Sequence, residues 1–306
     1  MKLSVSAAAA IPSELAAEYP FESRFLGVAG GRLHYVDEGP RDAPVVLCLH
    51  GNPTWSFYWR ALVKGLSDRW RVIALDHLGC GLSDKPQDWS YVLAAHVENV
   101  EALVRELGLA RLTLAVHDWG GAIGMGFARR HPELVERLVI TNTAAFASKR
   151  MPWRIRVCRT PLLGEFLVRR MNAFAGLAPR MASARRGGLD PVARRGLLLP
   201  YDSSAHRVAI ARFVQDLPMS RAHASWDEFA ATDAALASFA DRPALLAWGE
   251  RDWCFAKPFF EEWKRRLPGA ETALFPDAGH YVLEDAGAAL VHRVRSFLER
   301  TGEARA

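Results

Sequence analysis

The sequence predicts an α/β fold in which a mostly parallel, doubly wound sheet carries an inserted helical cap. Short apolar strand patterns alternate with helical patterns along most of the 306 residues, and the alternation stops between 144 and 241. The composition, 50% hydrophobic and 24% charged, is that of a globular protein large enough to bury a full core. No apolar run approaches the roughly 18 residues of a transmembrane helix, so we do not expect a membrane-spanning protein.

The N-terminal segment, MKLSVSAAAAIPSELAAEYP, superficially resembles a signal peptide, because Lys2 precedes an alanine run. Serines interrupt that run, and its apolar stretch is shorter than the core of a signal peptide usually is. We therefore expect residues 1–24 to form a frayed N-terminal leader ahead of the folded core.

Six segments are expected to form strands, because they are short, rich in β-branched and aliphatic residues, and almost continuously hydrophobic. Such strands are typical of a parallel sheet covered on both faces. In chain order they are 44–50, 71–77, 111–118, 135–142, 244–252 and 272–280. Helical patterns occupy 96–109, 259–267 and 289–300, which predicts a doubly wound arrangement.

The segment 144–241 is expected to form a cap over the sheet, because it follows one strand and precedes the next. It has the pattern of helices interrupted by prolines, namely Pro152, Pro161, Pro179, Pro191, Pro200 and Pro218. The α/β core then consists of residues 25–143 and 242–306.

The segment AVHDWGGAIG, residues 115–124, has the pattern of a strand, a tight turn and the start of a helix. That is the shape of a nucleophile elbow, the strained turn that raises one side chain above a sheet and usually carries a serine within Gly-x-Ser-x-Gly. Here Asp118 stands at the tip, and Val116 replaces the first glycine.

Four strand ends carry polar residues at the edge where open α/β sheets bind ligands. His50-Gly51-Asn52-Pro53 follows the first strand, Asp118-Trp119 follows the third, Asp252 closes the fifth and His280 closes the sixth. Each alone is more typical of a turn, because Asp, Asn and Gly favour turn geometry. Together, in the chain order nucleophile, acid, histidine, they match the triad order of the α/β-hydrolase fold.

The sequence indicates neither a cofactor nor a metal ion. The four cysteines are scattered without CxxC or metal-ligand spacing, which predicts no disulfide framework and favours a reduced, cytoplasmic setting. The turn 76–83 has paired glycines but lacks the third glycine of a dinucleotide fingerprint and an acidic residue placed to hold a ribose. We expect it to be a structural turn.

An aspartate at the elbow points to attack on a saturated carbon. A serine would leave an ether, which cannot be hydrolysed, whereas a carboxylate leaves an ester that can be cleaved or can depart again. The candidate electrophiles are an alkyl halide, an epoxide and the ring carbon of a strained lactone. Asn52 and Trp119 offer backbone and side-chain N–H donors where the leaving anion would collect.

At these residues the chain resembles the haloalkane dehalogenases. The matching stretches are HGNPTWSFYWR (50–60), AVHDWGGAIG (115–124), the acid Asp252, and AGHYVLED (278–285) around His280. The resemblance implies that Asp118 forms an alkyl ester and that Asn52 and Trp119 hold the released anion. It also implies that His280, paired with Asp252, activates water; no acidic residue ends the strand 135–142 to replace Asp252.

Three alternative functions are weakened by absences in the sequence. An epoxide hydrolase needs phenol donors from its cap, and residues 144–243 hold a single tyrosine, Tyr201. Haloacid enzymes of this fold place arginines just after the nucleophile, where this chain has Trp, Gly, Gly, Ala and Ile. A catalytically dead scaffold usually loses a triad member, whereas this chain keeps a candidate at every position.

The cap segment 141–182, followed by LPYDSSAHRVAIARFVQDLP and by DWCF (252–255), resembles the β-lactone decarboxylases of bacterial long-chain olefin biosynthesis, a branch of the dehalogenase-like group. The resemblance implies conversion of a long-chain cis-3-alkyl-4-alkyloxetan-2-one to a cis-alkene and carbon dioxide. Attack of Asp118 at the sp3 ring carbon and attack at the carbonyl both stay open.

The cap is strongly basic. Residues 150–212 contain thirteen arginines, no lysine and three acidic residues, although the whole chain has a formal net charge of only +5. A solvated arginine face is one interpretation. The other is a docking surface for the upstream β-lactone-forming enzyme or for a peripheral lipid surface. No nucleic-acid motif accompanies the charge, so we expect no nucleic-acid partner.

Overall fold

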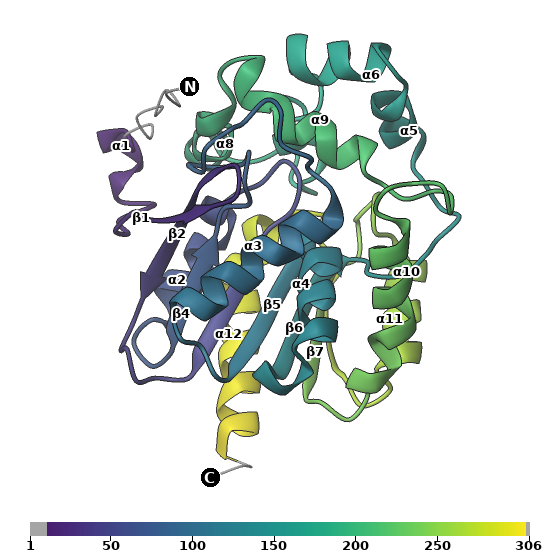
Figure 1. Cartoon of the computed structure of the whole chain (residues 1–306). Coiled ribbons are helices and arrows are strands. Elements are labelled where there is room, and N and C mark those ends of the chain that lie inside the picture. The colour runs from purple at the N-terminus through teal and green to yellow at the C-terminus, as the bar shows by residue number, and fades with distance from the viewer. Residues whose placement is uncertain (1–10, 304–306) are drawn as a thin grey trace.

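The computed structural model describes residues 11–303, and an eight-stranded sheet crosses it in the order β1-β2-β4-β3-β5-β6-β7-β8 (Figure 1). Strands β3 to β8 pair in parallel, whereas β1 pairs antiparallel with β2 and β2 antiparallel with β4. The predicted mostly parallel sheet is therefore confirmed. The strands are β1 Arg24–Val28, β2 Gly31–Glu38, β3 Val45–Leu49, β4 Arg71–Leu75, β5 Leu112–Asp118, β6 Val135–Thr143, β7 Ala244–Gly249 and β8 Glu271–Phe275.

The hairpin β1–β2 was not among the predicted strands. Its second strand carries buried polar side chains instead of a continuous apolar run: His34 bonds Asp76 at 2.8 Å, and Asp37 accepts two hydrogen bonds from Arg71. These partners lie far along the chain, so the strand does not stand out by hydrophobicity alone.

Both faces of the sheet are covered, as the near-continuous apolar strands predicted. Alternate residues of β3 enter two separate cores: Leu47 and Leu49 pack with α3 and α4, whereas Val46 and Cys48 pack with α2 and α12. In Figure 1, α3 and α4 lie in front of the sheet and α12 lies behind it. The sheet is doubly wound.

The helices of the core include the three expected from periodicity, with slightly different bounds. Helix α12 begins earlier than expected and is kinked at Gly287. The longer core helices are α2 Arg60–Leu66, α3 Leu93–Glu106, α4 Trp119–Arg130, α11 Lys257–Arg266 and α12 Val282–Glu303, with short turns η1 Ser56–Trp59, η2 Pro132–Leu134 and η6 Leu236–Phe239.

Between β6 and β7 the chain forms a run of short helices, most of which lie over the carboxyl ends of the strands (Figure 1). The last of them, α10, instead packs beside α4 on the flank of the core. The division into a cap at 144–241 and a core on either side stays a prediction. The elements are α5 Trp153–Arg159, α6 Leu163–Glu165, η3 Phe166–Arg170, α7 Ala178–Met181, α8 Pro191–Leu198, η4 Leu199–Tyr201, η5 Ala205–Arg207, α9 Val208–Gln215 and α10 Trp226–Ala235.

The expectation of a frayed leader over 1–24 was wrong for its second half, and residues 1–10 lie outside the described part. Helix α1, Ser13–Ala16, buries Leu15, and Tyr19 is buried with its hydroxyl 2.5 Å from Ser56 Oγ. Tyr19 also packs edge-on and obliquely against Phe21 and Trp55. Aromatic burial therefore anchors this segment to the core.

No helix within residues 11–303 is long and apolar enough to cross a membrane. The four cysteines are all free thiols. The turn 76–83 is structural, as expected: the Asp76 carboxylate accepts the backbone N–H groups of Ser56 and Leu82 at 2.6 and 2.8 Å.

Candidate active site

The elbow places Asp118 at the end of β5 and directly before α4. Its backbone has φ 50° and ψ −125°, a conformation that is strained for a residue with a side chain. The two residues after Trp119 must be glycines, because neighbouring atoms leave no room for a side chain. A methyl group at Gly120 would overlap the Leu49 carbonyl, and one at Gly121 would overlap the Thr143 hydroxyl. The turn thus holds the Asp118 side chain above the sheet.

The two carboxylate oxygens of Asp118 face different groups. Oδ1 accepts the backbone N–H of Asn52 at 2.7 Å, whereas Oδ2 lies 3.7 Å from His280 Nε2. Burial raises the pKa of Asp118 above its ordinary value, and this effect outweighs the His280 charge and the backbone N–H groups of Asn52 and Trp119, which lower it. Oδ2, which does not accept the Asn52 N–H, is the oxygen placed to attack an electrophile.

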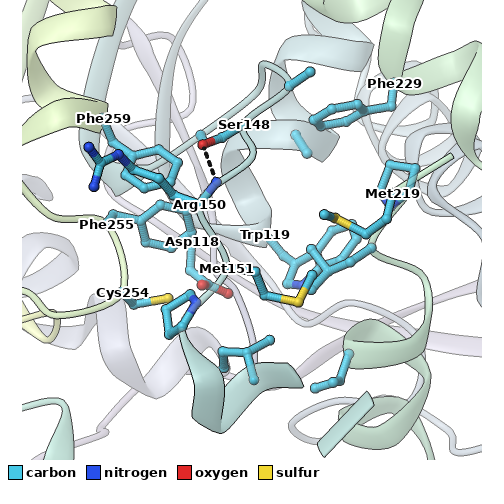
Figure 2. Close-up of a pocket in the computed structure, with 18 of the residues that line it drawn as sticks. Asp118, Trp119, Ser148, Arg150, Met151, Met219, Phe229, Cys254, Phe255 and Phe259 are labelled. Atoms are coloured by element: carbon cyan, nitrogen blue, oxygen red, sulfur yellow. Dashed lines mark hydrogen bonds between the residues drawn. The ribbon is translucent and has the colours of Figure 1, made fainter. Parts of the chain in front are cut away.

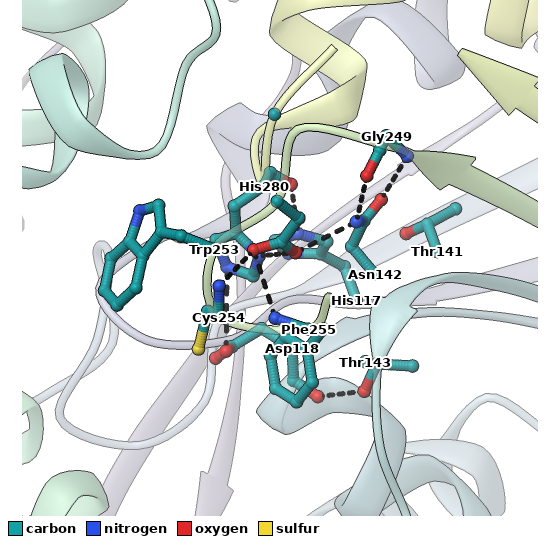
Figure 3. Close-up of polar contacts among 12 residues, drawn as sticks. His117, Asp118, Thr141, Asn142, Thr143, Gly249, Trp253, Cys254, Phe255 and His280 are labelled. Carbon is teal, nitrogen blue, oxygen red and sulfur yellow. Dashed lines mark hydrogen bonds and ion pairs between the residues drawn. The ribbon is translucent and has the colours of Figure 1, made fainter. Parts of the chain in front are cut away.

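His280 lies beside the nucleophile Asp118 (Figure 3). His280 Nδ1 bonds Asp252 Oδ2 at 2.9 Å. Burial by itself lowers the pKa of His280, but the charge and hydrogen bond of Asp252, together with the charge of Asp118, outweigh burial and leave the pKa raised. The three residues predicted as a triad are therefore brought together, with the imidazole between the two carboxylates.

Two polar neighbours of the triad were not singled out from the sequence (Figure 3). Asn142, at the end of β6, donates to Asp252 Oδ2 at 2.9 Å and accepts the Gly249 N–H at 2.8 Å. His117 Nε2 donates to the His280 carbonyl oxygen at 3.0 Å. The only feature of the sequence that could have indicated Asn142 is its position near the end of a strand. The predicted site residues were selected for the same kind of position.

The side chains of Asn52 and Trp119 both reach the cavity above Asp118. The Asn52 amide donates one N–H to the Ile210 carbonyl at 3.1 Å, and its second N–H stays available. The indole N–H of Trp119 has no protein acceptor among residues 11–303. Two donors are thus left for an anion beside the nucleophile.

Two cavities open at Asp118, one of about 500 Å³ and one of about 280 Å³. Figure 2 shows the larger, with Asp118 and Trp119 together and Met219, Phe229 and Phe259 around them. Both are lined mainly by apolar side chains, which suits a hydrophobic substrate.

The cap tyrosine that an epoxide hydrolase would need lies elsewhere. The Tyr201 hydroxyl donates to the Thr54 carbonyl at 3.1 Å, and Tyr201 lines neither cavity. The described residues also contain no cluster of His, Cys, Asp and Glu that could hold a metal ion. The predicted site residues that line the cavities therefore supply a carboxylate, an imidazole and N–H donors.

Comparison with known proteins assigns the chain to a family. Residues 44–287 match the family described as the alpha/beta hydrolase fold, which is more than half of the chain. The chain belongs to the α/β-hydrolases. Within this family it is 48% identical over 294 residues to a cis-3-alkyl-4-alkyloxetan-2-one decarboxylase of Xanthomonas campestris, a match that covers 92% of this α/β-hydrolase and 97% of the relative.

Two further relatives place this α/β-hydrolase in the haloalkane dehalogenase-like group. A cis-3-alkyl-4-alkyloxetan-2-one decarboxylase of Shewanella oneidensis is 42% identical, with 92% of this chain and 90% of the relative covered. The crystal structure of the haloalkane dehalogenase DbeA from Bradyrhizobium elkani superposes with a TM-score of 0.84 at 28% identity, covering 93% and 99% of the two chains.

Proposed function

We propose that this α/β-hydrolase is a β-lactone decarboxylase, a carbon–carbon lyase that converts a cis-3-alkyl-4-alkyloxetan-2-one into a cis-alkene and carbon dioxide. The observation that carries the proposal is an aspartate on the elbow of a chain 48% identical to such a decarboxylase over 92% of its length. A carboxylate forms an ester that can depart again, which a serine ether could not do. The reaction redistributes the atoms of the lactone and consumes neither water nor a cofactor.

The first bond forms between Asp118 Oδ2 and C4, the sp3 ring carbon that bears the lactone oxygen. The C4–O bond breaks, and the ring oxygen becomes part of a carboxylate attached to C3. That carboxylate then leaves as carbon dioxide, its C3 bonding pair forms the C3=C4 double bond, and the C4–Oδ2 bond breaks. Asp118 is regenerated as a carboxylate, so no other nucleophile is needed.

The stereochemistry of these steps accounts for a cis product. Displacement inverts C4 and places the ester oxygen of Asp118 anti to the new carboxylate. Anti departure of carbon dioxide and Asp118 then needs no rotation about C3–C4, so alkyl groups that are cis on the ring become cis on the alkene. The geometry of the lactone is thereby passed to the product.

The charges of the site favour ring opening by Asp118 followed by loss of carbon dioxide. The new carboxylate receives N–H donors from Asn52 and Trp119, but the rest of the cavity is lined mainly by apolar side chains, which solvate an anion poorly. Loss of carbon dioxide removes that charge and returns it to Asp118, whose Oδ1 keeps the Asn52 N–H. In this scheme His280 and Asp252 orient and electrostatically balance the nucleophile and do not activate water.

The alternative function is haloalkane dehalogenation, favoured by the free indole N–H of Trp119 and the imidazole beside Asp118. In that reaction His280 would activate water against an Asp118 alkyl ester. Product analysis separates the two reactions. The purified protein should release alkene and carbon dioxide from a cis-dialkyl β-lactone, and little bromide from a dibromoalkane in parallel. A β-hydroxy acid, or brisk bromide release without alkene, would assign the protein as a hydrolase.

We further propose that the cap docks against the enzyme that forms the β-lactone. Seven large apolar side chains are exposed on the cap between residues 153 and 177, three of which also line the smaller cavity. Exposed arginines, among them Arg154, Arg156 and Arg170, alternate with them along the chain, so this segment combines positive charge with exposed apolar side chains beside the smaller cavity. A substrate scarcely soluble in water could pass across such a contact. The seven are Trp153, Val157, Leu162, Leu163, Phe166, Met171 and Leu177.

The docking proposal is tested by charge reversal. Three exposed arginines of this part of the cap, each with no carboxylate partner within residues 11–303, are replaced by glutamate, namely Arg156, Arg170 and Arg180. Binding to the upstream enzyme should fall at least about tenfold while turnover of a short, soluble lactone is kept. Charge reversals at two exposed residues of the core, Arg105 and Lys257, should leave binding intact. Unchanged binding, or a loss seen only with anionic phospholipid vesicles, would overturn the proposal.

We also propose that the protein acts in the cytoplasm. All four cysteines are free thiols, as expected in a reducing compartment. Fractionation of the producing cells, with the protein recovered alongside the upstream enzyme, tests this placement.

A further inference from the structure

The two cavities of the active site meet at the nucleophile. Both are lined by Asn52 and Asp118, and both are bordered by Ile155, Phe174 and Cys254. Because these last three side chains line both cavities, we infer that they separate them, and we call them the partition. An electrophile bonded to Asp118 therefore has two separate directions in which its substituents can extend.

The cavities differ in size and in the elements that build them. The larger, about 500 Å³, is lined by Trp119 and by aromatic side chains that include Phe229, Phe255 and Phe259 (Figure 2). The smaller, about 280 Å³, lies under the cap helices, with Ala173 and Ala178 among its lining residues. Both therefore offer apolar surface for an alkyl chain, but in unequal space.

The smaller cavity reaches the surface beside the exposed apolar side chains of the cap. Trp153, Val157 and Leu177 line it and are also exposed. The larger cavity has other exposed residues in its lining, including Lys149 and Arg150. Each cavity therefore has exposed lining residues of its own.

The substrate of the proposed function has two alkyl chains, and both leave the same face of the four-membered ring from adjacent carbons. The ring must lie at Asp118, where C4 can be attacked. We propose that each cavity holds one alkyl chain, so that the partition fixes which ring carbon faces Oδ2. This inference rests on the proposed decarboxylase function.

One consequence is discrimination between regioisomers. A lactone with a long chain on C3 and a methyl group on C4 uses the opposite cavity for its long chain from a lactone with the two groups exchanged. Filling one cavity should therefore slow one isomer and spare the other. A site with a single shared cavity has no such property.

Two alanines allow matched substitutions. Ala178 lines only the smaller cavity and Ala144 only the larger, and each side chain ends at Cβ. Ala178→Leu and Ala144→Leu add the same volume on opposite sides of the partition. Ala234→Leu, on the exposed surface of α10, is the control for the added side chain.

The assay compares kcat/KM for carbon dioxide release from the pair cis-3-dodecyl-4-methyl- and cis-3-methyl-4-dodecyl-oxetan-2-one. Ala178→Leu should slow one isomer about tenfold or more and leave the other within about twofold, because overfilling a hydrophobic pocket is discriminated at this level. Ala144→Leu should show the reverse preference. Ala234→Leu should behave as the unaltered protein with both isomers.

Several results would overturn the assignment. Equal slowing of both isomers by each variant would mean that the cavities do not separate the chains. Slowing of both by Ala144→Leu and of neither by Ala178→Leu would place both chains in the larger cavity. A failure of the function itself looks different, because the unaltered protein would then release no carbon dioxide from either isomer.

Discussion

Replacing Asp252 with asparagine tests whether His280 must act as a base. The Asp252 carboxylate accepts four hydrogen bonds: Cys254 N at 2.6 Å, Phe255 N at 3.1 Å, Asn142 Nδ2 at 2.9 Å and His280 Nδ1 at 2.9 Å. An asparagine amide turns one of these acceptors into a donor. It would face the Asn142 amide and drive the His280 proton from Nδ1 to Nε2.

The expected losses of folding free energy and of turnover in Asp252→Asn can be estimated from the burial of the pair and the role of His280. Asp252 is 3% exposed and His280 is 6% exposed, so losing one charge breaks a buried pair and should cost about 3 kcal/mol of folding free energy. If His280 had to activate water, the wrong tautomer would lower turnover by about 10⁴. In the elimination route no proton passes through His280, so we expect at most about a hundredfold loss, or about 2.7 kcal/mol of barrier.

Turnover of a cis-dialkyl β-lactone by Asp252→Asn is followed as carbon dioxide release, and stability by urea unfolding. Asp277→Asn is the matched control, because Asp277 lies in the same part of the chain but is exposed and pairs with Arg251. It should leave both quantities almost unchanged. A loss near 10⁴ with a stable mass adduct on Asp118 would refute the non-hydrolytic role of His280.

Three other predictions concern the nucleophile and the core. Gly51→Ala should lower turnover about a hundredfold or more with the fold retained by circular dichroism, because the added methyl group overlaps the Asp118 carboxylate; full activity would refute this. Because burial raises the pKa of Asp118, kcat/KM should fall, as pH decreases, at a pH above the ordinary carboxyl value of 3.8; a profile that is flat down to 3.8 would contradict it. Burial lowers the pKa of His96 to about 3, so its contribution to stability is complete above the unfolded value of 6.5 and is lost as the unfolded chain takes up a proton at lower pH. His96→Phe should therefore reduce the slope of unfolding free energy between pH 6 and 4 by up to about 1.4 kcal/mol per pH unit, and an unchanged slope in urea titrations would count against this.

The six parallel strands could be predicted because burial on both faces demands continuous apolar runs, as in Val45–Leu49 and Leu112–Asp118. The antiparallel strand Gly31–Glu38 could not, because its His34 and Asp37 depend on partners brought close only by folding. Hydrophobic pattern alone carries no information about those distant pairs.

Some residues of the candidate site could likewise be predicted from the sequence, and others could not. Asp118, Asp252 and His280 could be predicted to meet, because the carboxyl ends of parallel strands share one edge of the sheet. Asn142 stands at the same edge, but a neutral amide at a strand end is indistinguishable from a turn residue until its bond to Asp252 is seen. The partition of the cavity depends on packing between distant segments, such as Ile155, Phe174 and Cys254, and no local pattern encodes it.

The most direct test of the proposed reaction is to let the protein turn over a cis-dialkyl β-lactone many times in H₂¹⁸O and then to weigh the peptide that contains Asp118. Elimination expels the Asp118 carboxylate with its own two oxygens, so the peptide should stay unlabelled while alkene accumulates. Hydrolysis of an Asp118 ester by water would place ¹⁸O in that carboxylate, and a labelled peptide would contradict the decarboxylase mechanism.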